Sequence, residues 1–426
     1  MDNLEVKESR VPDVVCDAGK LDIEQGLSVL LRRYLDLLNP GEVLAVRSQN
    51  PQVDHEIGPW CRLMGHDLRG SQKVGSYTEY WIRRGPATAL NTAERPDWGL
   101  RPKRQRNGHI LTEDWRTGRM APVPEEAPPT TGFAPRGAVR EKGFPEYPFR
   151  INKKEEVWSE EVAALYDHAT QNQWSAGQDI PWTDLKPLPE ILERAVCQLM
   201  TFLVENEYSA LYVPGKFISR INPQFNEVVL FLGTQLADEA RHIEVFTKRA
   251  LANGGGLQYS ATSTQMSLKT LYDQEDFTTA SFLLSVLGEG TFLDLLWFIE
   301  TYAPDPVTAE IMKRARQDES RHVRFGITHL KFYLQRDPAH SQKLLQAVQD
   351  RADYMKSVSG VNPLVQDALV FLAGGGEGPE QIQRGMQRVH QLYQRMHKNR
   401  TQRLQSIGLP LPQAEKMSLL HTPNFM

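Results

Sequence analysis

The sequence has few cysteines, and the three that it contains, Cys16, Cys61 and Cys197, are far apart. No Cys-x-x-Cys pair occurs, so the usual structural zinc site and a disulfide framework are both excluded. The N-terminal residues are polar and lack the apolar core of a signal peptide. These absences together predict a protein of the reducing cytoplasm.

The sequence also lacks an excess of charge of one sign and an unbroken hydrophobic run. Its 49 Lys and Arg residues nearly balance its 53 Asp and Glu residues, for a formal charge of −4. This balance does not indicate nucleic acid or a membrane surface as a partner. The most apolar segment, residues 280–300, is interrupted by Glu289 and Asp294. It therefore indicates a buried helix rather than a transmembrane span.

The first 150 residues show little regular periodicity and predict a mixed, loop-rich extension that covers the rest of the molecule. Residues 21–39 form one amphipathic pattern, whereas residues 40–94 fit no clear assignment. Residues 95–150 contain nine of the 27 prolines and many arginines. Such composition indicates loop, either a solvated arm or a cover over an active-site entrance.

A helical period begins near residue 155 and continues almost to the end, so few segments indicate strands. We expect an all-α fold with a helical bundle at 151–336 and further packed helices at 337–426. The expected helices lie near 156–172, 189–213, 223–252, 276–303, 306–335, 338–357, 362–373 and 378–405.

Two segments repeat one charged motif inside these apolar patterns. Residues 234–246 read TQLADEARHIEVF and residues 314–326 read RARQDESRHVRFG. In each, a glutamate and a histidine three residues apart project from one helix face and can bind one metal ion together. The alternative is an exposed helix face with ion pairs, but the flanking residues, such as Leu236 and Phe325, fit a core position.

A site for two metal ions needs two further carboxylates from two other helices. Upstream of the first motif the choice lies between Glu205 and Glu207, and Glu207 shares its face with apolar residues. Upstream of the second motif Glu289 stands between two glycines, which leave room for its carboxylate to move; Asp294 and Glu300 compete with it. The expected ligands and catalytic residues are Glu207, Glu239, His242, Glu289, Glu319 and His322.

This donor set predicts two iron ions, with manganese as an alternative, because zinc prefers fewer oxygen ligands. A metal site also accounts for the other charged residues of the two motifs. Asp238 and Asp318 can accept a hydrogen bond from the histidine of the opposite motif, and Arg241 and Arg321 can hold the aspartates.

The motifs resemble those of the ferritin-like carboxylate-bridged di-iron oxygenases, most closely the hydroxylase α-subunits of bacterial multicomponent monooxygenases. The resemblance covers about residues 155–335 and implies a ferritin-like four-helix bundle. It implies Glu207, Glu239 and His242 on one iron and Glu289, Glu319 and His322 on the other. Those monooxygenases have a threonine at the position of Leu293.

The implied function is an O₂-dependent non-heme di-iron oxygenase that oxidises a small organic substrate. Hydroxylation is the first expectation, with N-oxygenation, desaturation or halogenation as alternatives. Electrons must come from a separate ferredoxin or reductase, because the chain has no flavin or nicotinamide motif. A homodimer is compatible with the sequence, and so is a different role, a non-catalytic ferritin-like iron-handling protein.

Overall fold

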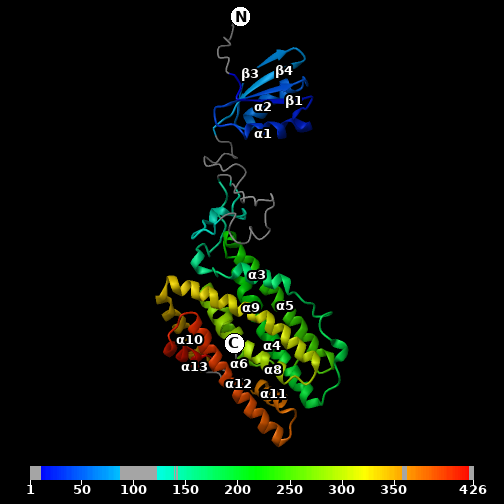
Figure 1. Cartoon of the computed structure of the whole chain (residues 1–426), viewed down its shortest axis with the longest axis vertical. Helices are drawn as coiled ribbons and strands as arrows, with labels where there is room; N and C mark the ends of the chain where they lie inside the picture. Colours follow the sequence, from blue (N-terminus) through cyan, green and yellow to red (C-terminus); the bar gives the residue numbers. More distant parts are fainter. Residues whose placement is uncertain (1–10, 87–121, 139, 141–142, 357–361, 422–426) are drawn as a thin grey trace, which may run out of the picture. The chain divides into compact units, whose positions relative to one another are not determined.

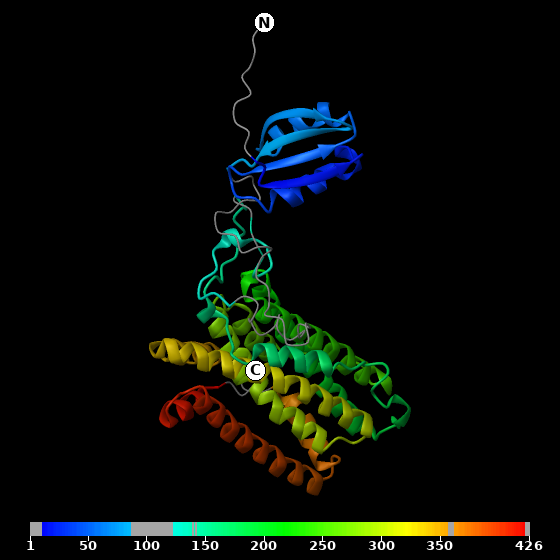
Figure 2. The same cartoon turned by 45° about the horizontal axis from the view of Figure 1, so that its top comes forward.

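The computed structural model describes residues 11–86, 122–138, 140, 143–356 and 362–421 (Figures 1 and 2). The chain divides into two compact units. Of the described residues, the N-terminal unit contains 11–86 and those within 137–145. The larger unit contains 122–136 and the described residues from 146 onward.

The N-terminal unit is a two-layer structure of one sheet and two helices. Its elements are β1 (Val14–Gly19), α1 (Ser28–Leu35), β2 (Val43–Ser48), α2 (Val53–Leu63), β3 (Asp67–Val74) and β4 (Tyr77–Arg83). The strand order is β1-β2-β4-β3, with β1 parallel to β2 and the other pairs antiparallel. Apolar residues of β1, β2 and β4 pack with those of α1 and α2 in one core.

The sequence analysis did not foresee this sheet, and the amphipathic pattern at 21–39 forms a shorter helical segment, residues 23–35, with an irregular first part. A short π-helical turn, Ile23–Leu27, precedes α1, because Gly26 adopts a positive φ of 114°. The strands were hard to recognise because β3 is mostly polar and exposed, and a register shift lies between Leu68 and Gly70. In β4 the alternation is clear, since Tyr80 and Ile82 are buried.

The larger unit is an all-α bundle, as the sequence predicts. Four long helical segments form it: α4 (Glu190–Ile218), α5 (Asn226–Ala252), the continuous run of α7 (Phe277–Ser281), η7 (Phe282–Glu289) and α8 (Gly290–Thr301), and α9 (Pro306–Arg336). α4 packs along α5, and α8 packs along α9. α9 begins where the sequence predicts, because Asp305 caps it by accepting the Thr308 N–H at 2.8 Å and Pro306 fits the first turn.

Further helices surround these four. They are α3 (Val162–Gln171), α6 (Thr262–Tyr272), α10 (Ser341–Met355), α11 (Pro363–Gly374), α12 (Pro379–Ser406) and α13 (Leu411–Leu420). α11 packs on α4, α12 packs on α8, and α3 contacts both α5 and α9. The sequence analysis missed α6 and α13.

Two expectations about individual segments can be compared with the structure. The run Phe277–Thr301 is long and apolar enough to cross a membrane, but 89% of its most apolar window is buried inside the unit, as in a core helix. Residues 95–121 lie outside the described residues. Arg136, from the same proline-rich segment, is not solvated: its buried guanidinium pairs with Glu227 of α5.

Candidate metal centre

The six predicted ligands lie together in the middle of the bundle, and each is at most 1% exposed. α4 contributes one, α5 two, η7 one and α9 two. In that order they are Glu207, Glu239, His242, Glu289, Glu319 and His322. The interpretation of both motifs as exposed helix faces is therefore wrong.

Two overlapping groups of donor atoms emerge from this cluster. One group contains Glu207, Glu239, His242 and Glu319, and the other contains Glu239, Glu289, Glu319 and His322. Within each group the donor atoms lie within 4.8 Å of one another. Glu239 and Glu319 belong to both groups, so each can bind both ions. The resemblance had instead implied Glu239 on one iron and Glu319 on the other.

Both histidines point the same ring nitrogen at the carboxylates. His242 Nδ1 lies 3.3 Å from Glu239 and 3.4 Å from Glu319. His322 Nδ1 lies 3.0 Å from Glu239 and 3.3 Å from Glu319. The two imidazoles therefore stand on opposite sides of the shared glutamates, as two neighbouring metal ions require.

The other ring nitrogen of each histidine is held by an aspartate of the opposite motif. His242 Nε2 lies 3.2 Å from Asp318, and His322 Nε2 lies 3.3 Å from Asp238. An Nε2–H that donates to a carboxylate leaves the Nδ1 lone pair for a metal ion. The exchange of aspartates between motifs, expected from the sequence, is confirmed.

Two arginines complete this network. Arg321 donates to Asp238 at 2.9 Å and to Asp318 at 2.6 Å. Arg241 donates to Asp318 at 3.0 Å and also contacts Asp238. Two positive and two negative side chains thus neutralise one another beside the site, which makes their burial affordable.

The pKa values of Glu207, Glu239 and Glu289 shift in different directions. Burial, and then the charge of Glu239, raises the pKa of Glu207 well above its usual range. Burial and the charge of Glu319 do the same to the pKa of Glu289. Burial also opposes the ionised form of Glu239, but the two histidines outweigh it and lower its pKa. Glu239 is therefore ionised more readily than Glu207 and Glu289, which carry the cost of burial and of crowded negative charge.

Several buried polar atoms of the cluster have no hydrogen-bond partner. They include one carboxylate oxygen each of Glu207 and Glu289, both oxygens of Glu239, and Nδ1 of His242. Buried polar groups without partners are rare and costly. Here they converge on the two groups of donors, so the residues fit two metal ions. Four carboxylates and two imidazoles suit iron, and manganese accepts the same set.

The choice of Glu207 over Glu205 agrees with the geometry. Glu207 lies in the donor cluster, whereas Glu205 does not belong to either group. The side of α4 that carries Glu205 is covered as well, because Thr201 and Ser209 are both buried. Gln258, in the segment before α6, donates its N–H to Thr201 at 2.7 Å, and the sequence of α4 alone does not reveal this cover.

The choice of Glu289 also agrees with the geometry, but its neighbours act differently from the expectation. Asp294 points away and accepts hydrogen bonds from Arg395 and Asn399 of α12. A side chain at Gly290 would meet Arg403 Nε at 2.5 Å. Gly290 thus leaves room for the Arg403 side chain of α12.

The sequence analysis missed two residues that hold the site. Gln235 Nε2 donates to Glu289 at 3.2 Å, and Trp174 Nε1 donates to Asp318 at 2.7 Å. Gln235 lies four residues before Glu239, so helical spacing offered a signal. Trp174 precedes the bundle in sequence, and nothing local indicates its partner.

A narrow cavity adjoins the Glu289 side of the site. Its walls are mostly apolar side chains of α4, α5, α7 and α9, with Gln235 and Ser285 as polar residues next to Glu289. Its volume of about 20 Å³ holds one water-sized molecule. Gln235 contacts Glu289 from this wall, so the cavity reaches the carboxylate shell.

His329, two turns beyond His322, is not part of the cluster. It is buried, with Nδ1 2.8 Å from the Trp158 carbonyl and Nε2 3.1 Å from Thr278. Burial lowers its pKa to about 4. Both ring nitrogens are thus used by the protein core, which leaves none for a metal ion.

Comparison with known proteins gives a result for the N-terminal part. The chain is 30% identical over 73 residues to the sulfur carrier protein TusA of Pseudomonas putida (strain GB-1), and 31% identical over 72 residues to TusA of Pseudomonas aeruginosa (strain LESB58). Each match covers 17% of this chain and 90% of the relative. The N-terminal unit, at residues 11–86, has the size of the match.

Through this unit the chain belongs to the TusA family. The relationship covers only this small part of the chain, and no protein-family model matches the sequence. Both cysteines of the TusA-like unit are 0% exposed: Cys16 in β1 and Cys61 in α2. Burial raises the pKa of Cys16 to about 11 and that of Cys61 to about 12.

Among solved structures, the chain resembles a point mutant of an R2-like ligand-binding oxidase with an aerobically reconstituted Mn/Fe cofactor. The TM-score is 0.46 at 19% identity, and the match covers 57% of this chain and 93% of that one. An R2-like ligand-binding oxidase with a metal cofactor after photoconversion gives a TM-score of 0.45, also at 19% identity, with 57% and 92% covered.

Proposed function

We propose that the bundle is an O₂-dependent di-iron oxidase that oxygenates a small, largely apolar organic substrate. The observation that carries the proposal is the pair of buried donor groups that share Glu239 and Glu319. Two bound iron ions would supply the electrons that reduce O₂. Manganese at one position is compatible with the same donors.

The protein's own residues have three tasks in this proposal. Asp238 and Asp318 fix the histidine tautomer, so that each Nδ1 faces a metal position. The apolar walls of the adjoining cavity keep bulk water from the reacting centre. Gln235, which lines the cavity, donates its carboxamide N–H to Glu289 and thereby limits the movement of that carboxylate.

Hydroxylation is the favoured outcome because it fits a small apolar cavity. One oxygen atom of O₂ enters a C–H bond of the substrate, and the other leaves as water after two electrons and two protons are supplied. We propose a ferredoxin or reductase as the electron donor, since the chain carries no organic cofactor motif. The cavity holds only a water-sized molecule, so an organic substrate requires its walls to move apart.

The test is O₂ uptake by protein loaded anaerobically with Fe(II). We expect rapid consumption of about one O₂ per pair of irons, and no uptake by the Glu319→Ala variant. A matched control is Glu310→Ala, since Glu310 lies on the same helix and pairs with Lys313 and Arg314 outside the cluster. Slow, non-stoichiometric uptake with many irons bound per chain would instead favour iron handling.

We further propose that the TusA-like unit does not carry sulfur on a cysteine and serves recognition instead. A thiol that carries sulfur must be accessible and must ionise. Cys16 and Cys61 are buried with raised pKa values, and the third cysteine, Cys197, is buried in the bundle. The free thiols are compatible with a cytoplasmic location.

A further inference from the structure

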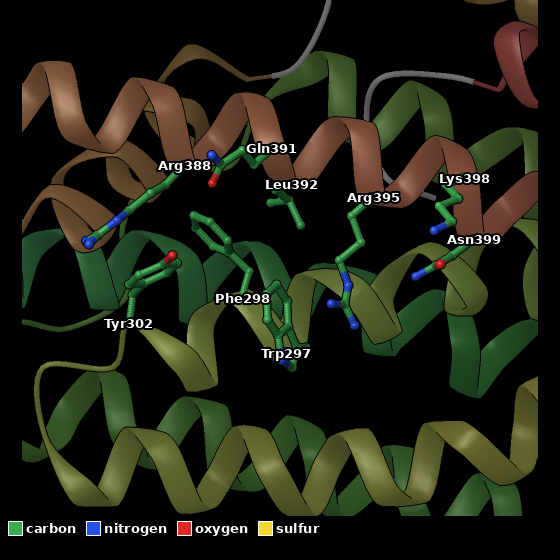
Figure 3. Close-up of a pocket in the computed structure, with 9 residues that line it drawn as sticks. All are labelled: Trp297, Phe298, Tyr302, Arg388, Gln391, Leu392, Arg395, Lys398 and Asn399. Atoms are coloured by element: carbon green, nitrogen blue, oxygen red, sulfur yellow. The ribbon is translucent and has the colours of Figure 1, made fainter.

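A second pocket lies outside the bundle core, in the groove between α8 and α12 (Figure 3). Its volume is about 400 Å³, within the range of sites for organic ligands. Trp297, Phe298 and Tyr302 enter it from α8 and the residue after it. α12 lines the opposite side, so the pocket is separate from the metal centre.

The charge of this groove is positive. Arg388, Arg395 and Lys398 of α12 line it, and no carboxylate does. Arg395 is partly neutralised from below, because its Nε donates to Asp294 at 2.8 Å. Arg388 and Lys398 form no ion pair with any residue in the described part of the chain, so the groove keeps an excess of two positive charges.

The groove also has flat and apolar surfaces. The Arg395 guanidinium stacks 3.8 Å from the centre of the Trp297 ring, and that of Arg388 lies 4.6 Å from the centre of the Tyr302 ring. Phe298 and Leu392, each 1% exposed, form the floor between them. Planar guanidinium–ring pairs of this kind accept a further flat group by stacking.

Each end of the groove has a guanidinium–ring pair, but the further N–H donors lie at one end only. Arg395, Lys398 and Asn399 fall within about one turn of α12, which gathers several N–H donors in one place. Tyr302 and Arg388 lie toward the other end, about 10 Å away for seven helical residues. A ligand that fits both ends therefore carries an anion at one end and a ring at the other.

We propose that this groove binds an organic phosphate that bears an aromatic ring. The phosphate lies against Arg395, Lys398 and Asn399, and the ring lies over the apolar floor beside Tyr302. The phosphate pairs with the uncompensated charge of Lys398, and Arg388 adds a second positive charge about 10 Å away at the other end of the groove. The inference concerns a binding site apart from the oxygenase proposal and does not depend on it.

The experiment uses the full chain and AMP as the probe, with inorganic phosphate and adenosine as its two halves, followed by calorimetry or by the fluorescence of Trp297. We expect saturable AMP binding that weakens with added salt, and binding of each half at least about tenfold weaker. Two variants test the contributions of the two ends of the groove to binding. Lys398→Gln should weaken AMP and phosphate alike by about tenfold, whereas Tyr302→Ala should weaken AMP and leave phosphate unchanged.

Lys313→Gln is the matched control, because Lys313 is an exposed lysine on α9 that pairs with Glu310. It should leave AMP binding unchanged. Absence of saturable AMP binding, equal affinity for AMP and phosphate, or equal loss in Lys398→Gln and Lys313→Gln would each overturn the inference. The metal content of every variant should equal that of the parent protein. A change in AMP binding can then be assigned to the groove and not to the metal centre.

Discussion

The two units of the molecule differ in sequence similarity to known proteins and in the reactivity of their side chains. The TusA-like unit has recognisable relatives along nearly their whole length, yet both of its thiols are sealed in an apolar core. The bundle matches no family model, yet six chemically competent side chains from four helical segments meet at its centre. Sequence similarity and the integrity of a reactive site are thus independent properties in this chain.

The difference has a physical origin in the kind of burial. Cys16 and Cys61 lie among apolar residues, where burial keeps a thiol protonated and inert. The carboxylates of the bundle are buried beside histidines, and those histidines are held by an Asp–Arg network. Burial therefore makes the thiols of the TusA-like unit unreactive. In the bundle, burial of several carboxylates together favours the binding of cations.

The largest effect is expected from the removal of a glutamate that belongs to both donor groups. Glu239→Ala should lose both metal ions, because Glu239 belongs to both donor groups. Glu205→Ala, two residues from Glu207 on α4, should keep both, since Glu205 lies outside the groups. Elemental analysis after anaerobic Fe(II) loading gives the answer; retention of one ion by Glu239→Ala would mean that the glutamate is not shared.

A second prediction concerns the thiols of the TusA-like unit. Iodoacetamide should alkylate Cys16 and Cys61 at least about 100-fold more slowly in the native protein than in urea, because raised pKa values and burial both suppress the thiolate. Mass spectrometry of peptides quantifies this. Rapid native labelling of either residue would restore the possibility of a sulfur-carrying cysteine.

A third prediction uses pH and concerns the core beside the metal centre. The pKa of His329 is lowered to about 4 in the folded protein from an ordinary 6.5, so the unfolded chain takes up its proton first as pH falls. Stability is then present above pH 6.5 and is lost between about pH 6.5 and 4, by about 3 kcal/mol.

The measurement is the free energy of unfolding of the bundle by urea at several pH values, for the parent and for His329→Gln. The variant should lose less stability over this range, because glutamine does not titrate. Parallel curves for the two proteins would show that His329 accepts its proton without cost.

The smallest expected effect comes from the network around the ligands. Asp318→Asn should keep the fold but weaken metal binding about 10- to 100-fold, since the amide holds the His242 ring less firmly. Competition with a chelator measures the change. Asp294→Asn is the control, because Asp294 is equally buried on a neighbouring helix but binds Arg395 and Asn399 instead.

Much of the bundle and its site could be predicted because helical spacing places residues on one face. Glu239 with His242, and Glu319 with His322, needed only that rule, and the exchanged aspartates followed from the repeat of the motif. Trp174 and Arg136 could not be placed, since they act on partners far away in sequence. The sheet was missed because β3 is polar and exposed, so alternation between two faces is absent there.

The most direct test of the central claim is the metal content of the parent protein. Full-length chain, loaded with Fe(II) under anaerobic conditions and freed of excess metal by gel filtration, should contain about two iron ions per chain by elemental analysis. The two shared glutamates predict that these ions bind and leave together on titration with a chelator. Fewer than about one ion per folded chain would contradict the account, because the buried carboxylates would then have no cations to hold them.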